Sequence, residues 1–224
     1  MIGCSNKGKA FEEVKGVALT YSEFFKPFDR LDERKKITYY KPIGIEELES
    51  FLPEQLTKEI MTIDSKKLPF EVDDAKVFLV SSEDDKGDVK NQVQLSYISK
   101  DENDVDGFFN ISVTEVDENP IEGYPFSDEV DSVGNQFKKE ILTDELPIFQ
   151  QIITTNSALV YRYYESDESK ERIVTVATSA NEIYSYYNGF VYHIGYYIDS
   201  GKGNKEIHNE MLKLAREYIL GNSL

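Results

Sequence analysis

The stretch EIYSYYNGFVYHIGYYI at residues 182–198 constrains the fold more than any other part of the chain. Asn188 and Gly189 form the pair preferred in two-residue type I′ hairpin turns, because both residues tolerate a positive φ. A turn at this point places Tyr184 opposite His193 on the returning strand. The sequence therefore predicts an antiparallel β-hairpin over residues 182–198.

Side chains alternate between the two faces of a strand, so the hairpin has two predicted faces. The expected core face, under a helix, carries Ile183, Ser185, Tyr187, Phe190, Tyr192, Ile194, Tyr196 and Ile198. The other face is aromatic but ends in hydroxyls and an imidazole, as sugar-binding and peptide-binding surfaces often do. We name four candidate ligand-binding residues on it: Tyr184, Tyr186, His193 and Tyr197. The alternative is that cross-strand tyrosine pairs only stabilise the sheet, by roughly 0.2–1 kcal/mol each.

The same period of two recurs along most of the chain after residue 66, and it predicts further strands. These segments lie at 67–72, 75–82, 91–100, 107–116, 158–166 and 171–178. Turn-forming and acidic residues fill 101–107 and 119–135, which we expect to be loops. The longer of the two could act as a lid over a site.

Three segments carry apolar residues at helical spacing: 10–28, 44–61 and 204–222. In the first, Gly16 weakens the helical pattern, and a strand over 17–22 is the competing interpretation. The last is the clearest helix, because Asn204 is a good N-cap and Gly221 follows the final apolar residue.

These elements predict an α+β fold, a curved and mostly antiparallel sheet packed with N-terminal and C-terminal helices. Residues 1–10 are polar and glycine-rich, which is typical of a flexible tether. We expect 11–224 to form a single domain, with a subdivision near 120–135 as the alternative.

The charge balance is strongly acidic, with 25 basic residues against 42 acidic ones and a net charge of −17. Binding to a phosphate backbone depends on Lys and Arg, so we expect no nucleic-acid partner. The chain contains one cysteine, which excludes an internal disulfide and a cysteine-cluster metal site.

Searches for catalytic and cofactor motifs identify no site. The chain has two histidines and no G-x-S-x-G nucleophile turn. The acidic stretch at 101–107 fails as an EF-hand loop, because position 12 falls on Ser112 or Val113 instead of Glu. The GKGNK stretch at 201–205 lacks the Ser or Thr of a phosphate-binding loop. We therefore predict no catalytic residue, no metal and no cofactor.

The N-terminal residues resemble a bacterial lipoprotein signal. Ile2, Gly3 and Cys4 match an aliphatic residue, a small residue and the cysteine that carries the lipid, and Ser5-Asn6-Lys7 resembles the polar tether that follows. The resemblance implies that residues 1–10 include the remnant of this signal and that Cys4 is lipidated. It also implies that the protein is held on the extracytoplasmic face of the bacterial cell membrane.

The body of the chain, over about residues 66–220, resembles a family of extracytoplasmic domains of unknown function from Gram-positive bacteria. Such domains occur in lipoproteins and beside anti-sigma regulators. The resemblance depends on Leu68-Pro69-Phe70, Val93–Tyr97, IYSYYNGFVYHI at 183–194 and LAREYI at 214–219. The family often has a Trp before the turn of this hairpin, where Tyr184 or Tyr186 stands here. It implies a curved sheet closed by helices and supplies no catalytic residues.

The expected function is a membrane-anchored, non-catalytic binding or sensing module whose ligand is a peptide, a glycan or a lipid. Two alternatives remain. One is a cell-wall hydrolase that uses paired carboxylates. The other is a cytosolic acidic interaction protein whose Met1 is the native start.

Overall fold

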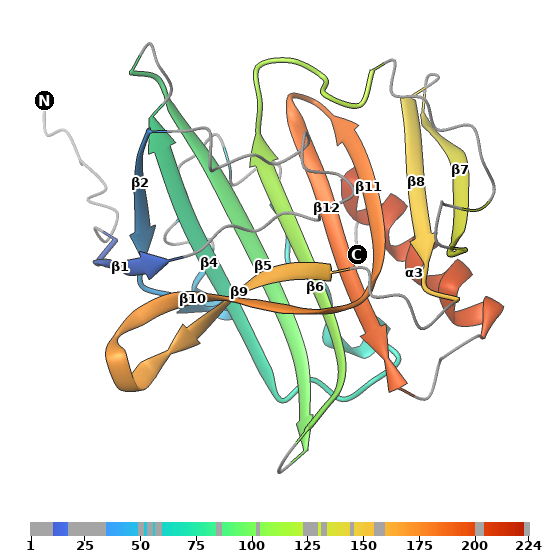
Figure 1. Ribbon diagram of the computed structural model, residues 1–224, viewed down its shortest axis with the longest axis horizontal. Helices are drawn as coiled ribbons and strands as arrows, with labels where there is room; N and C mark the ends of the chain where they lie inside the picture. Colours follow the sequence, from blue (N-terminus) through green and yellow to red (C-terminus); the bar gives the residue numbers. More distant parts are fainter. Residues whose placement is uncertain are drawn as a thin grey trace, which may run out of the picture.

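In the computed structural model of the chain, the described residues form one sheet of twelve strands, mostly antiparallel, and the predicted strands other than 67–72 belong to it (Figure 1). The structure describes residues 11–17, 35–48, 52, 56, 60–83, 87–101, 104–122, 130, 134–143, 146–154, 160–199 and 204–221. The strands are β1 (Glu13–Val17), β2 (Lys35–Tyr40), β3 (Ile43–Gly44), β4 (Asp74–Glu83), β5 (Val89–Asp101), β6 (Asp104–Glu115), β7 (Gln136–Thr143), β8 (Leu146–Ile152), β9 (Val160–Asp167), β10 (Arg172–Ser179), β11 (Asn181–Tyr187) and β12 (Phe190–Ile198). They lie in the order β7-β8-β11-β12-β6-β5-β4-β2-β1-β10-β9, and β3 pairs with β4 beside this path.

The hairpin predicted over 182–198 is confirmed as β11 and β12. Tyr184 pairs with His193, as the turn requires. Asn188 has a φ of 50° and Gly189 a φ of 86°, which are the positive values of a type I′ turn.

One face of the sheet forms the main hydrophobic core, and the helix α3 (Lys205–Ile219) packs on it. Ile183, Tyr192, Ile194 and Tyr196 contribute from the hairpin face predicted to be the core. The Asn204 side chain caps α3 by accepting a hydrogen bond from the Glu206 N–H. The C-terminal helix and its N-cap are therefore confirmed.

The predicted α+β fold, a curved and mostly antiparallel sheet packed with N-terminal and C-terminal helices, is wrong. The fold is mostly β, and α3 is the one α-helix with both ends in the described residues. Within the predicted helix 10–28, Glu13–Val17 form the strand β1. The Gly16 backbone lies so close to the Tyr39 ring that a Cβ would come within 2.2 Å of it. The pairing of β1 with β2 and β10 keeps this segment extended, and apolar spacing along one segment cannot reveal such pairing.

Two boundary predictions also fail. Residues 68–72 of the predicted strand 67–72 have no regular structure and follow a short 3₁₀ helix η3 (Ser65–Lys67). The predicted loop 101–107 is mostly strand, because β6 begins at Asp104 and pairs with the end of β5. Most of 18–34, 49–59 and 123–133 lies outside the described residues, so the other predictions for 10–28, 44–61 and 119–135 stay untested.

The second face of the sheet is crossed by a β-arm, residues 160–179, made of β9, the 3₁₀ helix η4 (Glu168–Lys170) and β10. Figure 1 shows this arm running across β4, β5 and β6. At one end, β1 pairs antiparallel with β2 and parallel with β10. At the other end, only Ala180 separates β10 from β11 in the main sheet. The arm is thus attached to the sheet on both sides.

Gln94 of β5 binds the middle of the arm as a strand would. Its Oε1 accepts a hydrogen bond from the Tyr164 N–H at 2.8 Å, and its Nε2 donates to the Tyr164 carbonyl at 3.0 Å. The Tyr164 hydroxyl donates to Gln92 Oε1 at 2.7 Å, so both glutamines bind one residue of the arm. All three side chains are completely buried.

We predict that Gln94→Met destabilises the protein by about 2–4 kcal/mol, because it removes both hydrogen bonds between the Gln94 side chain and the buried Tyr164 backbone. Urea unfolding measures this change. Gln136→Met, at an exposed position of β7, is the control and should change stability by less than about 0.5 kcal/mol. Equal stability of the two variants would contradict a stabilising role for Gln94.

Candidate ligand-binding cleft

Two of the four candidate ligand-binding residues meet beneath the arm. The rings of Tyr184 and His193 stack with centroids 4.3 Å apart. His193 Nε2 lies 2.8 Å from Glu182 Oε2, and the Tyr184 hydroxyl donates to the same carboxylate. These three side chains are at most 1% exposed.

Sequence reasoning missed Glu182, although alternation puts it on the same face as Tyr184. It also missed Tyr161 of the arm, whose ring meets the His193 ring edge-on at 5.1 Å. Tyr161 lies over Gly195, where a Cβ would come within 2.2 Å of the ring. The arm therefore covers the part of the face that holds Tyr184 and His193.

The other two candidates make different contacts. Tyr186 packs against a small apolar cluster that includes Tyr184 as well as Ile121 and Phe149. Tyr197 stacks near Phe108 of β6, with ring centroids 6.1 Å apart. Ligand binding by the four residues stays a prediction, and of the four only Tyr197 lines one of the two hollows beside the arm described below.

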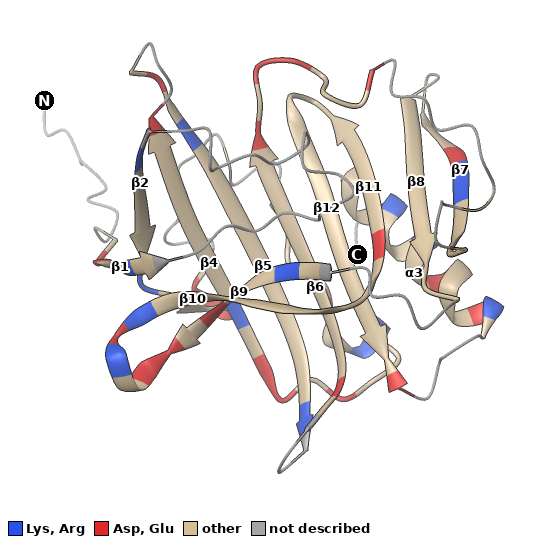
Figure 2. Ribbon diagram, in the orientation of Figure 1, with Lys and Arg blue, Asp and Glu red and all other residues tan. Residues whose placement is uncertain are grey.

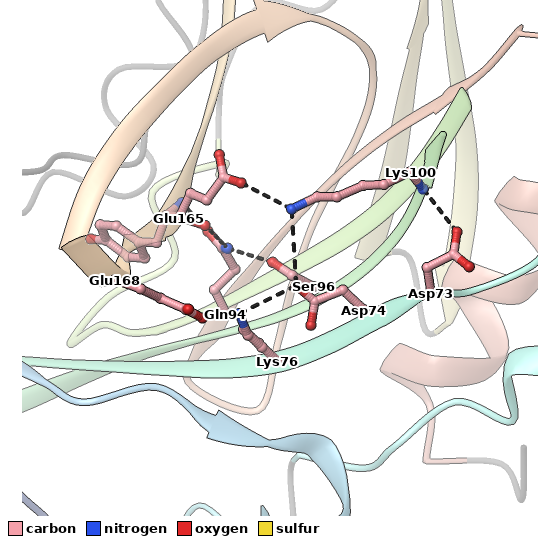
Figure 3. Close-up of polar contacts among 9 residues, drawn as sticks. Asp73, Asp74, Lys76, Gln94, Ser96, Lys100, Glu165 and Glu168 are labelled. Carbon is pink, nitrogen blue, oxygen red and sulfur yellow. Dashed lines mark hydrogen bonds and ion pairs between the residues drawn. The ribbon is translucent and has the colours of Figure 1, made fainter. Parts of the chain in front are cut away.

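The first hollow, the charged pocket, lies where the arm tip meets β4 and β5 and has a volume of about 390 Å³. Figure 3 shows its lysines between carboxylates of the sheet and the arm. Lys76 Nζ lies 3.3 Å from Asp74 and 3.4 Å from Glu168, and Lys100 Nζ lies 3.2 Å from Glu165. Charges of both signs also alternate along the arm tip in Figure 2.

Partial burial of Lys76 favours its neutral form, but the neighbouring Asp74 and Glu168 carboxylates outweigh burial and raise its pKa above the ordinary value. Lys76 is therefore a permanent cation that pairs one carboxylate of the sheet with one of the arm. The ion pairs in this pocket connect the arm to the sheet, so the charged groups there are paired with one another.

The second hollow, the binding cleft, has a volume of about 920 Å³, within the range of small-molecule sites. It lies between the end of the arm, the ends of β8 and β12, and the first turn of α3. The described lining comprises Val105, Phe108, Gln136, Ile152, Ile153, Thr154, Tyr163, Val176, Ala177, Thr178, Ser179, Ala180, Asn181, Tyr196, Tyr197, Ile198, Lys205, Ile207 and His208. None of these residues is acidic, in a chain with 42 Asp and Glu, and Lys205 is the one permanent charge among them.

Aromatic rings form one wall of the binding cleft. Phe108 lies in a near-parallel stack with Tyr163 of the arm, at 5.6 Å between centroids and 28° between planes. Burial raises the pKa of the Tyr163 hydroxyl to about 12, and the nearby Glu165 carboxylate acts in the same direction. This hydroxyl is therefore neutral at physiological pH and available only as a hydrogen-bonding group.

At the helix end, the binding cleft is lined by a buried histidine. His208 is 6% exposed, and its Nδ1 lies 3.0 Å from the Tyr196 hydroxyl. Gln150 Nε2 donates to that hydroxyl at 2.9 Å and to the His208 carbonyl at 2.8 Å. Burial lowers the pKa of His208, so the ring is neutral at pH 7. The sequence could have predicted that His208 is buried, because it lies three residues before the buried Met211 on the apolar stripe of α3.

Among the described residues, no three His, Cys, Asp or Glu side chains are arranged to hold a metal ion. Cys4 lies outside the described part of the chain. The binding cleft therefore offers neutral hydrogen-bonding groups, apolar walls and one cation.

Comparison of the chain with protein-family models, curated proteins and solved structures gave no match. The resemblance to a lipoprotein-associated family stays a prediction, and the function is inferred from the cleft.

We predict that the pH dependence of stability contains a contribution from His208. Because burial lowers its pKa, the unfolded chain binds a proton below about pH 6.5 while the folded protein resists it, so stability falls as the pH falls. Between pH 7.5 and 5.5, urea unfolding of His208→Gln should show a shallower loss than the wild type, with the difference in slope at most about 1.4 kcal/mol per pH unit. His193 is present in both proteins, so any contribution it makes is the same in the two profiles and does not affect their difference. Parallel profiles would contradict this prediction.

Proposed function

We propose that the protein is a non-catalytic binding module whose ligand occupies the binding cleft, and that a lipid on Cys4 holds the module on the extracytoplasmic face of a bacterial membrane. The observation that carries the binding function is a hollow of about 920 Å³ without acidic lining among its described residues, in a protein with a net charge of −17. In a chain so rich in carboxylates, a hollow of this size without acidic residues in its described lining suits contact with an apolar ligand.

The contacts favour binding over the alternative of a hydrolase with paired carboxylates. A general acid in such an enzyme must hold its proton near neutral pH, which a neighbouring ammonium group opposes. In the charged pocket, Asp74, Glu165 and Glu168 each lie within 3.4 Å of a lysine ammonium. Ion pairing accounts for this arrangement.

The membrane part of the proposal rests on Ile2-Gly3-Cys4 and on the polar residues that follow. No helix in the described part of the chain combines the length and the apolar character needed to cross a bilayer. A diacylglyceryl cysteine would supply two acyl chains, and two chains hold a protein to a membrane far more firmly than one.

For the cleft, we predict saturable binding of the neutral fluorescent probe phenylnaphthylamine, and weaker binding after the cleft is filled. Ala177 lines the cleft and is exposed, so Ala177→Trp adds an indole there without disturbing the core. We expect it to raise the dissociation constant about tenfold, or about 1.4 kcal/mol, in a fluorescence titration.

Ser169→Trp is the matched control, because Ser169 is an exposed residue of the same arm that lines the charged pocket. It should leave binding within about twofold of the wild type. The natural chain has no Trp, so indole emission reports directly whether each new side chain is shielded from water. Equal binding by the two variants, or no saturable binding, would exclude this cleft as the site.

For the anchor, we predict that the protein produced from its complete gene in a bacterium partitions into the detergent phase, and that Cys4→Ser moves it to the aqueous phase. The thioether to the lipid needs the Cys4 sulfur, and the hydroxyl of Ser cannot replace it. Partition of the wild type into water would favour the cytosolic interaction protein instead.

A further inference from the structure

The hydrogen bonds around His208 favour one of the two neutral forms of its ring. The His208 carbonyl can only accept, so the Gln150 atom 2.8 Å away must be the amide nitrogen. The same nitrogen donates to the Tyr196 oxygen, so a Tyr196 hydroxyl that donates to His208 Nδ1 satisfies both its acceptor and its donor, whereas a proton on Nδ1 would leave the hydroxyl proton without that acceptor. A neutral ring that accepts at Nδ1 carries its proton on Nε2.

This Nε2–H is a buried donor that meets no hydrogen-bond partner among the described residues. A buried donor without an acceptor costs about 1–3 kcal/mol. His208 also lines the binding cleft, so a ligand with an acceptor oxygen could remove this cost. The structure thus contains an unused hydrogen-bond donor at the helix end of the cleft.

Two further features favour a negatively charged acceptor at this end. Lys205 lies three residues before His208, which puts the two side chains on neighbouring positions of one helix surface, and both line the cleft. They belong to the first turn of a helix of 15 residues, where the helix dipole favours anions. Glu206, the acidic residue of this turn, is not in the described lining of the cleft.

The rest of the described lining carries no charge and offers mostly apolar surface. Phe108, Val176 and Ile198 contribute from the sheet and the arm, and Tyr163 and Tyr197 extend the aromatic wall. A ligand that satisfies both regions has an apolar body and one anionic oxygen group.

We propose that the binding cleft takes an amphipathic carboxylic acid, whose carboxylate accepts a hydrogen bond from His208 Nε2–H and pairs with Lys205, while its apolar body lies along Phe108. This inference rests on the proposed binding function and names the class of ligand. The overall charge of −17 opposes an anion at long range, so recognition depends on these short-range contacts.

Isothermal titration of the full chain with dodecanoate and with dodecanol, both below micelle formation, tests the head group directly. We expect dodecanoate to bind at least about tenfold more tightly than dodecanol. In Lys205→Gln, an exposed substitution, the preference should fall below about threefold. Lys213→Gln, on an exposed part of the same helix outside the lining, should keep it.

The outcomes separate the two proposals. Saturable phenylnaphthylamine binding with equal affinity for dodecanoate and dodecanol would leave the binding function standing and overturn the carboxylate inference. A loss of preference in both lysine variants alike would also overturn it, because it would reflect net charge alone. No saturable binding of dodecanoate would overturn it whatever the neutral probe does.

A spectroscopic measurement tests the role of His208 without relying on a variant to bind. The chain has two histidines, so the long-range proton–nitrogen spectrum of labelled imidazoles contains two patterns, and His208→Gln assigns them. We expect His208 as the Nε2-protonated tautomer, with a ring signal that shifts on addition of dodecanoate and not of dodecanol. A proton on Nδ1, or equal shifts with both ligands, would overturn the inference.

Discussion

The side-chain amide of Gln94 holds the arm on the sheet by making the two hydrogen bonds that a neighbouring strand would make. Gln94 gives Tyr164 both a donor and an acceptor, and so adds one step of strand pairing between segments 70 residues apart in the sequence. Both hollows depend on it, because each is bounded by the arm on one side and by the sheet on the other. Were the arm to leave the sheet, the charged pocket and the binding cleft would both become open surface. The position of Tyr164 therefore controls the shape of every candidate site described.

A polar sheet face normally faces water, and here the arm buries it. Such burial requires a partner for each polar group. Gln92 meets this need by accepting from the Tyr164 hydroxyl and donating to Thr114 at 2.8 Å. The side chains of Asn110 and Ser112 are buried and meet no hydrogen-bond partner among the described residues. Apolar residues there would bind the arm more strongly, so the polar face costs stability. The arm also stacks the rings of Tyr161 and Tyr163 near Phe108 of the sheet, and these contacts stabilise its position.

The sequence pattern predicted the elements that depend on interactions between residues close in sequence. The hairpin follows from Asn188-Gly189 and its register from the turn, and α3 follows from its stripe and the Asn204 cap. The arm could not be predicted in this way, because its strands pair with β1 and cover β5 through contacts far apart in sequence. The same limit applies to the candidate site. The alternation of side chains along β12 placed Tyr197 on the face that borders the binding cleft, but alternation could not show that β9 covers His193. The sequence shows that His208 belongs to the buried stripe of α3, but not that Gln150 and Tyr196 of the sheet bind it there.

The way the arm is attached also determines how the cleft can work. A ligand site that must order itself on binding loses affinity to that cost, whereas a preformed site does not. At the cleft, β10 passes into β11 through Ala180 alone, and Ala180 is 1% exposed. The wall formed by the arm is therefore a direct continuation of a central strand of the sheet. On the opposite side, His208 is held by Tyr196 of β12 and by Gln150 of β8. Both walls are thus fixed to the sheet before any ligand arrives, and the donor of His208 is held in place with them. Under the proposed binding function, such walls favour a ligand that already matches the cleft in shape and charge.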